Sequence, residues 1–270
     1  MTGSVGEFLG RMQQTLYPTF TPGPGGCDGL KAGDPDQPLS GVGVCFSASL
    51  ELLRAAREEG LNLIVTHEPT YFSHDDATAH LQADPVYRAK RALIEEAGLV
   101  IYRLHDRPHA GPDDPFVRGL AAALGWPQPE GVPAPVCLDI PPTSLARLAG
   151  EVAGRLGADG LRWAGDGGQM VKRVVLSPGA AGGEAHRRLL VRWEPDALIC
   201  GEVHEWETPE YRQDAAAAGQ PLGLLVTGHA ASELPGVQEV ARGLEGAFPE
   251  TRIVFLPMRA ELRGGFSGGG

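Results

Sequence analysis

The stretch that most constrains this chain is a short apolar run that ends in a histidine and a carboxylate, residues 61–72, LNLIVTHEPTYF. The run is rich in β-branched residues and follows a helix-like segment that ends at Gly60, a pattern typical of a buried parallel strand. Pro69 prevents the strand from continuing. Ligands bind outside the carboxyl ends of the strands in open α/β sheets, so the position of His67 and Glu68 favours a metal site.

The order of elements around this run occurs twice along the chain. Strand-like segments lie at 42–46, 61–65, 99–105, 174–176, 197–200 and 222–229. Helix-like segments lie between them or beside them, at 4–17, 47–60, 86–98, 114–124, 184–193 and before Gly219. Strands that alternate with helices predict right-handed βαβ units and a parallel sheet. We therefore expect an α/β fold in two related halves, joined by a proline-rich connector at 125–142.

Histidines gather at the ends of the predicted strands. Of the eight histidines, five lie there: His67, His105, His109, His204 and His229. Imidazole and carboxylate ligands without thiolate suit Zn, Mn, Fe, Co or Ni better than Mg or Ca. A single tetrahedral zinc ion takes four ligands, so a larger set predicts two ions about 3.5–4 Å apart. A lone histidine at a strand end often only caps a loop, so the prediction depends on several strand ends acting together.

The segment GHAASELPG places His229 and Glu233 four residues apart. Proline fits the first turn of a helix, so Pro235 predicts a helix that begins near Ser232, with His229 in the preceding turn. Glu233 is then equally consistent with a metal ligand and with an acid favoured by the helix dipole.

Two further segments supply candidates. In 105–109, HDRPH, the proline predicts extended backbone, which presents His109 while His105 stays near the strand. Asp106 either orients one of these histidines or pairs with a neighbouring arginine. Glu202 and His204 follow the strand at 197–200 and are candidate catalytic acid/base or substrate-binding residues, although a structural role in that half is equally consistent.

The charge balance argues against a nucleic-acid-binding role. The chain has 23 basic and 34 acidic residues and a net charge of −11, without a basic run, whereas sequence-independent binding depends on Lys and Arg at the phosphates. The four cysteines show no CxxC spacing, which favours free thiols in a reducing compartment. No signal-peptide pattern and no apolar stretch near about 18 residues occurs. We therefore expect a cytoplasmic protein without a membrane partner.

Several motifs stand in an order that resembles one family: CDGLKAGDP, IVTHEPTYF, LHDRPHAGPDD, SPGAAGG, CGEVHEW and TGHAASELPGV. Over nearly its whole length the chain resembles the dinuclear-metal family of NGG-interacting-factor-three-like proteins, long named type 2 GTP cyclohydrolase I. The family motifs Thr-His-His-Pro, His-Thr-Asn-x-Asp and Gly-His-x-x-x-Glu correspond to 66–69, 105–109 and 228–233. His67, His229 and Glu233 match directly, whereas Glu68 replaces a histidine and His109 replaces an aspartate.

The resemblance implies a metal site built from these strand ends. One histidine has become a carboxylate and one carboxylate a histidine, so three histidines and two carboxylates remain, and we expect the site to persist. The predicted ligands, with the neighbouring strand-end histidine included, are His67, Glu68, His105, His109, His229 and Glu233. They would hold two divalent transition-metal ions in the cleft between two α/β lobes with mixed, largely parallel sheets. The lobes are expected at 1–130 with 226–270 and at 131–225, in a toroidal homohexamer.

Two functions use the same donors. The first is a metal-dependent hydrolase of an unknown small molecule, with nucleotides and other phosphate compounds as candidate substrates. The second is a non-catalytic scaffold that binds or delivers metal. A nucleic-acid-binding ring follows only from a toroidal shape, and the net charge disfavours it.

Overall fold

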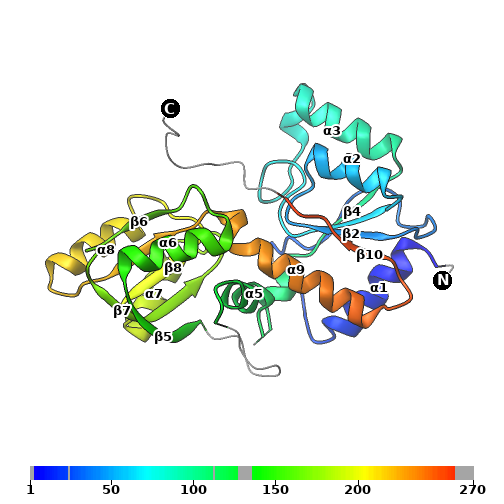
Figure 1. Ribbon diagram of the computed structural model, residues 1–270. Coiled ribbons are helices and arrows are strands. Elements are labelled where there is room, and N and C mark those ends of the chain that lie inside the picture. The colour runs from blue at the N-terminus through cyan, green and yellow to red at the C-terminus, as the bar shows by residue number, and fades with distance from the viewer. Residues whose placement is uncertain (1–2, 24, 112, 127–135, 259–270) are drawn as a thin grey trace, which may run out of the picture. The chain divides into compact units, whose positions relative to one another are not determined.

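The computed structural model describes residues 3–23, 25–111, 113–126 and 136–258 (Figure 1). The chain divides into two compact units, Met1–Pro112 with Val237–Met258, and a second that contains Asp113–Gly236. Each unit has its own five-stranded sheet. None of the helices in the described ranges is long and apolar enough to cross a membrane.

The sheet of the first unit is mostly parallel. Its strand order is β1 (Gly29–Ala32), β4 (Val100–Arg103), β3 (Leu63–Thr66), β2 (Val42–Cys45) and β10 (Ile253–Phe255). Only β1 runs antiparallel to its neighbour among these pairings. The remaining elements are α1 (Val5–Leu16), α2 (Leu50–Glu58), η1 (Ala79–Leu81), α3 (Pro85–Glu96) and α4 (Asp106–His109). The final strand β10 returns to the first sheet, where it pairs with β2.

The sheet of the second unit repeats this plan. Its strand order is β5 (Cys137–Ser144), β7 (Met170–Ser177), β8 (Ala197–Cys200), β9 (Gly223–Val226) and β6 (Arg162–Ala164). Its edge strands β5 and β6 run antiparallel to their neighbours and the inner pairings are parallel. The helices are α5 (Pro115–Ala123), α6 (Leu145–Leu156), α7 (Gly183–Trp193) and α8 (Thr208–Ala217), and α9 (His229–Ala247) continues into the first unit.

The two units share one arrangement of four strands. The order β1-β4-β3-β2 in the first corresponds to β6-β9-β8-β7 in the second, and in both the antiparallel edge strand precedes the three parallel strands along the chain. The prediction of two related α/β halves with mixed, largely parallel sheets is confirmed.

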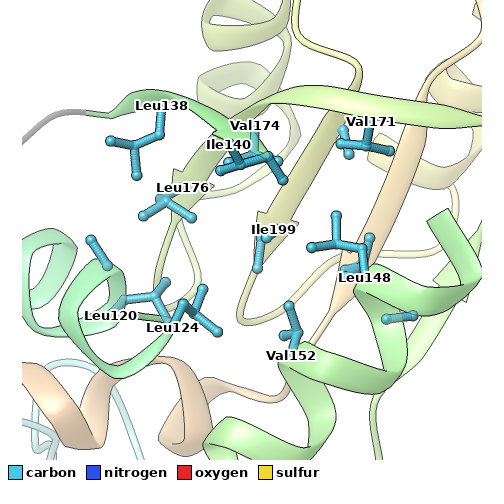
Figure 2. Close-up of a cluster of buried hydrophobic side chains, with 14 of the residues drawn as sticks. Leu120, Leu124, Leu138, Ile140, Leu148, Val152, Val171, Val174, Leu176 and Ile199 are labelled. Atoms are coloured by element: carbon cyan, nitrogen blue, oxygen red, sulfur yellow. The ribbon is translucent and has the colours of Figure 1, made fainter. Parts of the chain in front are cut away.

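Apolar sequence runs become the inner strands because they are covered on both faces. Every residue of β2, β3, β4, β8 and β9 is buried, as expected of parallel strands between helices. Figure 2 shows the core of the second unit, where helices α5 and α6 face the sheet. The labelled side chains are Leu120, Leu124, Leu138, Ile140, Leu148, Val152, Val171, Val174, Leu176 and Ile199.

The prediction of an irregular connector at 125–142 is wrong for its last part, which forms a strand. The predicted connector at 125–142 includes residues outside the described ranges, but its end belongs to β5, which contains Pro141 and Pro142. This strand lies at the sheet edge, and its register shifts between Asp139 and Thr143. Proline lacks a backbone donor, so an edge strand with an irregular register tolerates it where an inner strand does not. The strand predicted at 222–229 also stops earlier, at Val226.

Candidate metal centre

The turn after β3 fixes the positions of His67 and Glu68. The backbone N–H of His67 donates to the Cys45 carbonyl at 3.1 Å, and that of Glu68 donates to the Phe46 carbonyl at 2.6 Å. The Thr66 hydroxyl lies 3.1 Å and 2.9 Å from the carbonyl oxygens of Phe46 and Glu68. Both side chains therefore start from a backbone that continues the order of the sheet.

The segment after β4 is helical, so the prediction of extended backbone at 105–109 is wrong. The turn α4 exists because the Asp28 carboxylate accepts hydrogen bonds from the backbone N–H groups of residues 105–107, at 2.6, 2.7 and 3.1 Å. These are donors that a helix start leaves unpaired. Pro108 lies in the first turn, where its missing N–H costs no helical bond. This turn carries His105 and His109 toward His67.

His67, His105 and His109 form one cluster. Their donor nitrogens lie within 4.8 Å of one another. The rings of His67 and His105 stack with centroids 4.6 Å apart, and the His109 ring lies 5.3 Å and 5.2 Å from them. Two nitrogens that each bind zinc at about 2.0–2.1 Å lie about 3–4 Å apart. Three imidazoles at this spacing therefore fit a transition-metal ion.

The surroundings of His105 favour its neutral form, and those of His67 fix its orientation. Burial lowers the pKa of His105, and the neighbouring His67 lowers it further. His67 is 3% exposed, and its Nδ1 lies 3.4 Å from the carbonyl oxygen of Leu104. A backbone acceptor at Nδ1 fixes the tautomer and leaves Nε2 as the ligand atom.

Glu68 adds a carboxylate to this cluster. Its Oε1 lies 3.8 Å from His105 Nε2 and 4.0 Å from His67 Nε2. Its Oε2 lies 3.3 Å from Arg103 Nη2. The first unit thus brings together four predicted ligand residues, and their binding of a metal stays a prediction.

Asp106 orients His105, which is the first of the two roles considered for it. Its Oδ1 lies 2.9 Å from His105 Nδ1, and the same oxygen accepts from the Cys27 thiol at 3.1 Å. The Cys27 backbone N–H donates to Oδ2 at 2.7 Å. Burial raises the pKa of Asp106, but the hydrogen bonds from Cys27 and His105 outweigh it and lower the pKa to about 2. The carboxylate is therefore ionised at neutral pH, and both of its oxygens have hydrogen-bond partners.

His229 and Glu233 lie together in the second unit. His229 Nε2 is 3.0 Å from Glu233 Oε2, and the Glu233 side chain is 3% exposed. The other ring nitrogen, Nδ1, lies 3.2 Å from Glu202 Oε1. The ring is therefore held between a buried carboxylate and an exposed one.

The predicted helix start near Ser232 is wrong, because α9 begins at His229 and contains Pro235. Residues 229 and 233 consequently occupy one helix face at i,i+4 spacing. Pro235 removes one hydrogen bond inside this helix, and it lies where α9 packs closely against α5. A Cβ on Gly119 of α5 would lie 2.6 Å from the Pro235 carbonyl carbon, and one on Gly236 would lie 2.5 Å from Phe116 Cα. Two glycines thus let α5 and α9 approach at this point.

The two candidate catalytic residues, Glu202 and His204, contact different side chains. Glu202 contacts His229, and its side chain is 57% exposed. His204 is 70% exposed, its Nδ1 lies 3.4 Å from Glu207 Oε2, and its ring stacks on Trp206 with centroids 5.6 Å apart. Glu202 is therefore placed to orient His229, whereas His204 belongs to a surface cluster.

Three residues with a direct part in the geometry were missed from the sequence: Cys27, Asp28 and Arg103. The first two lie in the CDGLKAGDP motif, which marked the family but offered no strand or helix pattern from which to place it. Arg103 lies inside a strand, where the sequence gives no sign that its side chain turns toward the β3 turn. Proximity to His105 and Glu68 arises only from the sheet pairing.

The fold and its donor clusters define an α/β protein with a candidate metal centre. The family model for Duf34/NIF3 (NGG1p interacting factor 3) matches residues 12–261. The chain therefore belongs to the Duf34/NIF3 family, and the predicted resemblance is confirmed.

Relatives and solved structures agree with this assignment. A protein of Clostridium perfringens named GTP cyclohydrolase 1 type 2 homolog is 23% identical over 223 residues, which are 79% of this chain and 80% of the relative. The crystal structure of Staphylococcus aureus protein SA1388 aligns with a TM-score of 0.76 at 17% identity, over 97% of this chain and 99% of that one. A Bacillus cereus protein related to NIF3 aligns with a TM-score of 0.72 at 15% identity, over 95% and 97%. At these identities the structures support the fold.

Proposed function

We propose that this chain is a metalloprotein that holds two divalent transition-metal ions, of Zn, Fe, Mn, Co or Ni, and hydrolyses a small molecule with them. The observation that carries the proposal is the cluster of His67, His105 and His109, whose donor nitrogens lie within 4.8 Å of one another. Such ions supply Lewis acidity and a hydrolytic nucleophile at neutral pH.

The chain's own residues would divide the work. In the first unit the three histidines offer neutral donors and Glu68 offers one negative charge. In the second unit, His229 offers a neutral imidazole donor and Glu233 offers a carboxylate. A cluster of imidazoles and carboxylates suits transition metals better than Mg or Ca, which prefer oxygen ligands.

Glu202 and His204 are the proposed groups for proton transfer and substrate contact. Glu202 lies against His229 and is open to solvent, so it can hold that ring in one tautomer and exchange protons with water. The His204 ring is exposed, and the Glu207 carboxylate lies beside its Nδ1 as a hydrogen-bond acceptor. Nucleotides and other phosphate compounds are the first substrates to test, because the relative from Clostridium perfringens is named a GTP cyclohydrolase 1 type 2 homolog.

The assembly proposed for this chain, on the basis of the family resemblance, is a toroidal homohexamer, and its proposed location is the cytoplasm. Light scattering on the purified protein would give the molar mass directly. A mass of one chain, independent of concentration, would refute the hexamer without touching the metal proposal.

Metal content and turnover test the function separately. Purified protein loaded with Zn²⁺, Mn²⁺ or Fe²⁺ is expected to retain two ions per chain after desalting, and H67A is expected to lose at least one. H80A is the matched control, because His80 is an exposed histidine on η1. Wild-type protein that retains no metal would refute the proposal outright.

The loaded protein is then assayed against GTP, other nucleotides and phosphate esters. Turnover that disappears in H67A and persists in H80A supports the hydrolase. Bound metal with no turnover, together with rapid transfer to a chelator, supports the alternative, a non-catalytic scaffold that binds or delivers metal.

A further inference from the structure

Arg103 is a charged residue at the carboxyl end of β4 in the first unit's sheet. Its side chain is fully buried, with a relative exposure of 0%. Its Nε donates to the backbone carbonyl of His67 at 3.1 Å, and Nη1 donates to the carbonyl of His74. The remaining contact, from Nη2, goes to the Glu68 carboxylate at 3.3 Å. All three contacts are with the segment that follows β3.

The sheet itself does not require an arginine at this place. In the first unit Arg103 pairs with Thr66, the last residue of β3. In the second unit Cys200, the last residue of β8, pairs with Val226. The two pairs occupy equivalent places in the repeated plan, and an apolar side chain completes β9. The guanidinium of Arg103 is therefore not needed by the strand plan that both units share, and its role must lie in a feature of the first unit alone.

A buried guanidinium is always charged and needs a counter-charge, because the removal of an ion from water is strongly unfavourable. The Glu68 carboxylate is the counter-charge in contact with it. This contact divides the two carboxylate oxygens: Oε2 faces Arg103, and Oε1 lies 3.8 Å and 4.0 Å from the Nε2 atoms of His105 and His67. One oxygen is thereby anchored, and the other is directed at the imidazole cluster.

We propose that Arg103 is a positioning residue of the metal centre, which fixes the Glu68 carboxylate so that Oε1 alone is presented as a ligand. This inference rests on the proposed metal binding and extends it. The family motif has histidine at the position of Glu68, so the chain's own ligand needs a partner that a neutral imidazole does not. Arg103 supplies both that charge and the geometry.

A purely structural role is the alternative, because Arg103 also holds two backbone carbonyls. Four proteins separate the two: R103M, R103K, E68Q and the double variant E68Q/R103M. The matched control is R173M, which removes an arginine from β7 whose partner Asp139 lies 2.9 Å away on the surface. Each is titrated with Co²⁺ against a competing chelator, and the visible absorption of bound cobalt reports the coordination.

The Co²⁺ dissociation constant of R103M is expected to rise about 10–100-fold, the range found when a group that orients a metal ligand is removed. The cobalt spectrum should change as well. R103K should weaken binding about tenfold or more, because an ammonium group cannot reproduce the fixed fork of a guanidinium. The double variant should bind no more weakly than the weaker single variant, since both changes break one contact. R173M should match the wild type.

The outcomes are distinct. If folded R103M, or R103K where R103M does not fold, binds Co²⁺ with wild-type affinity and spectrum, the inference is overturned while the metal proposal stands. A lowered melting temperature of the metal-free variant with an unchanged dissociation constant would overturn it as well, because Arg103 would then act only on the fold. If the wild type binds no Co²⁺, the proposed function itself has failed.

Discussion

The two units have the same strand plan and carry different chemistry at equivalent positions. Two residues past β3 stands Glu68, whose N–H donates to the Phe46 carbonyl, and two residues past β8 stands Glu202, whose N–H donates to the Gly179 carbonyl. The Glu68 side chain is 14% exposed and contacts a buried arginine, whereas that of Glu202 is 57% exposed and contacts His229. The scaffold fixes where a side chain begins, and the surrounding residues decide what it does.

The comparison also shows how the repeat has diverged. His67 in the first unit corresponds to Gly201 in the second, because each N–H donates to the last residue of the preceding strand, Cys45 or Ser177. A Cβ at Gly201 would lie 2.5 Å from the carbonyl oxygen of Gly179. The second unit therefore has no room for a histidine at the position of Gly201 without a backbone shift, and the histidine of its candidate ligand pair, His229, comes from α9.

The largest difference is expected in stability when the two equivalent glutamates are truncated. E68A leaves the Arg103 charge buried without its carboxylate, and loss of one partner of a buried pair costs about 3–5 kcal/mol. E202A removes an exposed side chain and should change the unfolding free energy by no more than about 0.5 kcal/mol. Urea unfolding of the two variants in the presence of a chelator measures both. Equal destabilisation would contradict the asymmetry between the units.

Much of the fold was predictable because inner parallel strands have a strong sequence pattern. The strands β2, β3 and β8 are buried at every residue, and each reads as an apolar run, except for Thr66 at the end of β3. The edge strand β6 is short and largely exposed, with an Arg-Trp-Ala sequence that resembles no core. Edge strands owe their existence to a neighbour, here β9, and a single sequence does not show that neighbour.

The site was predictable as far as its donors lie at strand ends. His67 and His105 follow from the rule that ligands collect at the carboxyl ends of strands. The residues that position these histidines could not be predicted from the sequence. Asp28, for example, caps α4 although it lies 77 to 79 positions away along the chain. The helical start of α9 was missed for a similar reason, since the packing of Gly119 against Pro235 overrides the local preference of proline.

The next largest difference concerns the carboxylates that orient histidines. In D106N the amide replaces a carboxylate that contacts His105 Nδ1 at 2.9 Å and also holds Cys27, so Zn²⁺ affinity should fall about 10–100-fold. E202Q changes a longer contact of 3.2 Å on an exposed side chain, and a loss of about threefold or less is expected because solvent screens it. Chelator competition with Zn²⁺ measures both constants. A greater loss in E202Q would move the centre of metal binding to the second unit.

The smallest effect should appear in alkaline solution, through buried thiols that include Cys45 in the first unit and Cys200 in the second. Burial raises the pKa of Cys45 to about 12 and that of Cys200 to about 12. The thiols of an unfolded chain have a pKa of about 8.5. Above that pH the unfolded chain loses thiol protons that the folded chain keeps. Fewer protons on the unfolded state mean that the unfolding free energy falls as the pH rises. Urea unfolding between pH 8 and pH 10.5 would show this decline.

The slope of that decline, rather than the absolute stability, identifies the thiols. C45A and C200A each leave a small cavity at every pH, but each should flatten the alkaline decline because one titrating group is removed. C137A is the control, since Cys137 lies in the edge strand β5 and is only partly buried; its slope should stay closer to the wild type. If C45A and C200A retain the wild-type slope, the decline has another source. Lys90 cannot be the source of the decline. Burial lowers its pKa to about 8, and a lowered lysine pKa makes the unfolding free energy rise with pH.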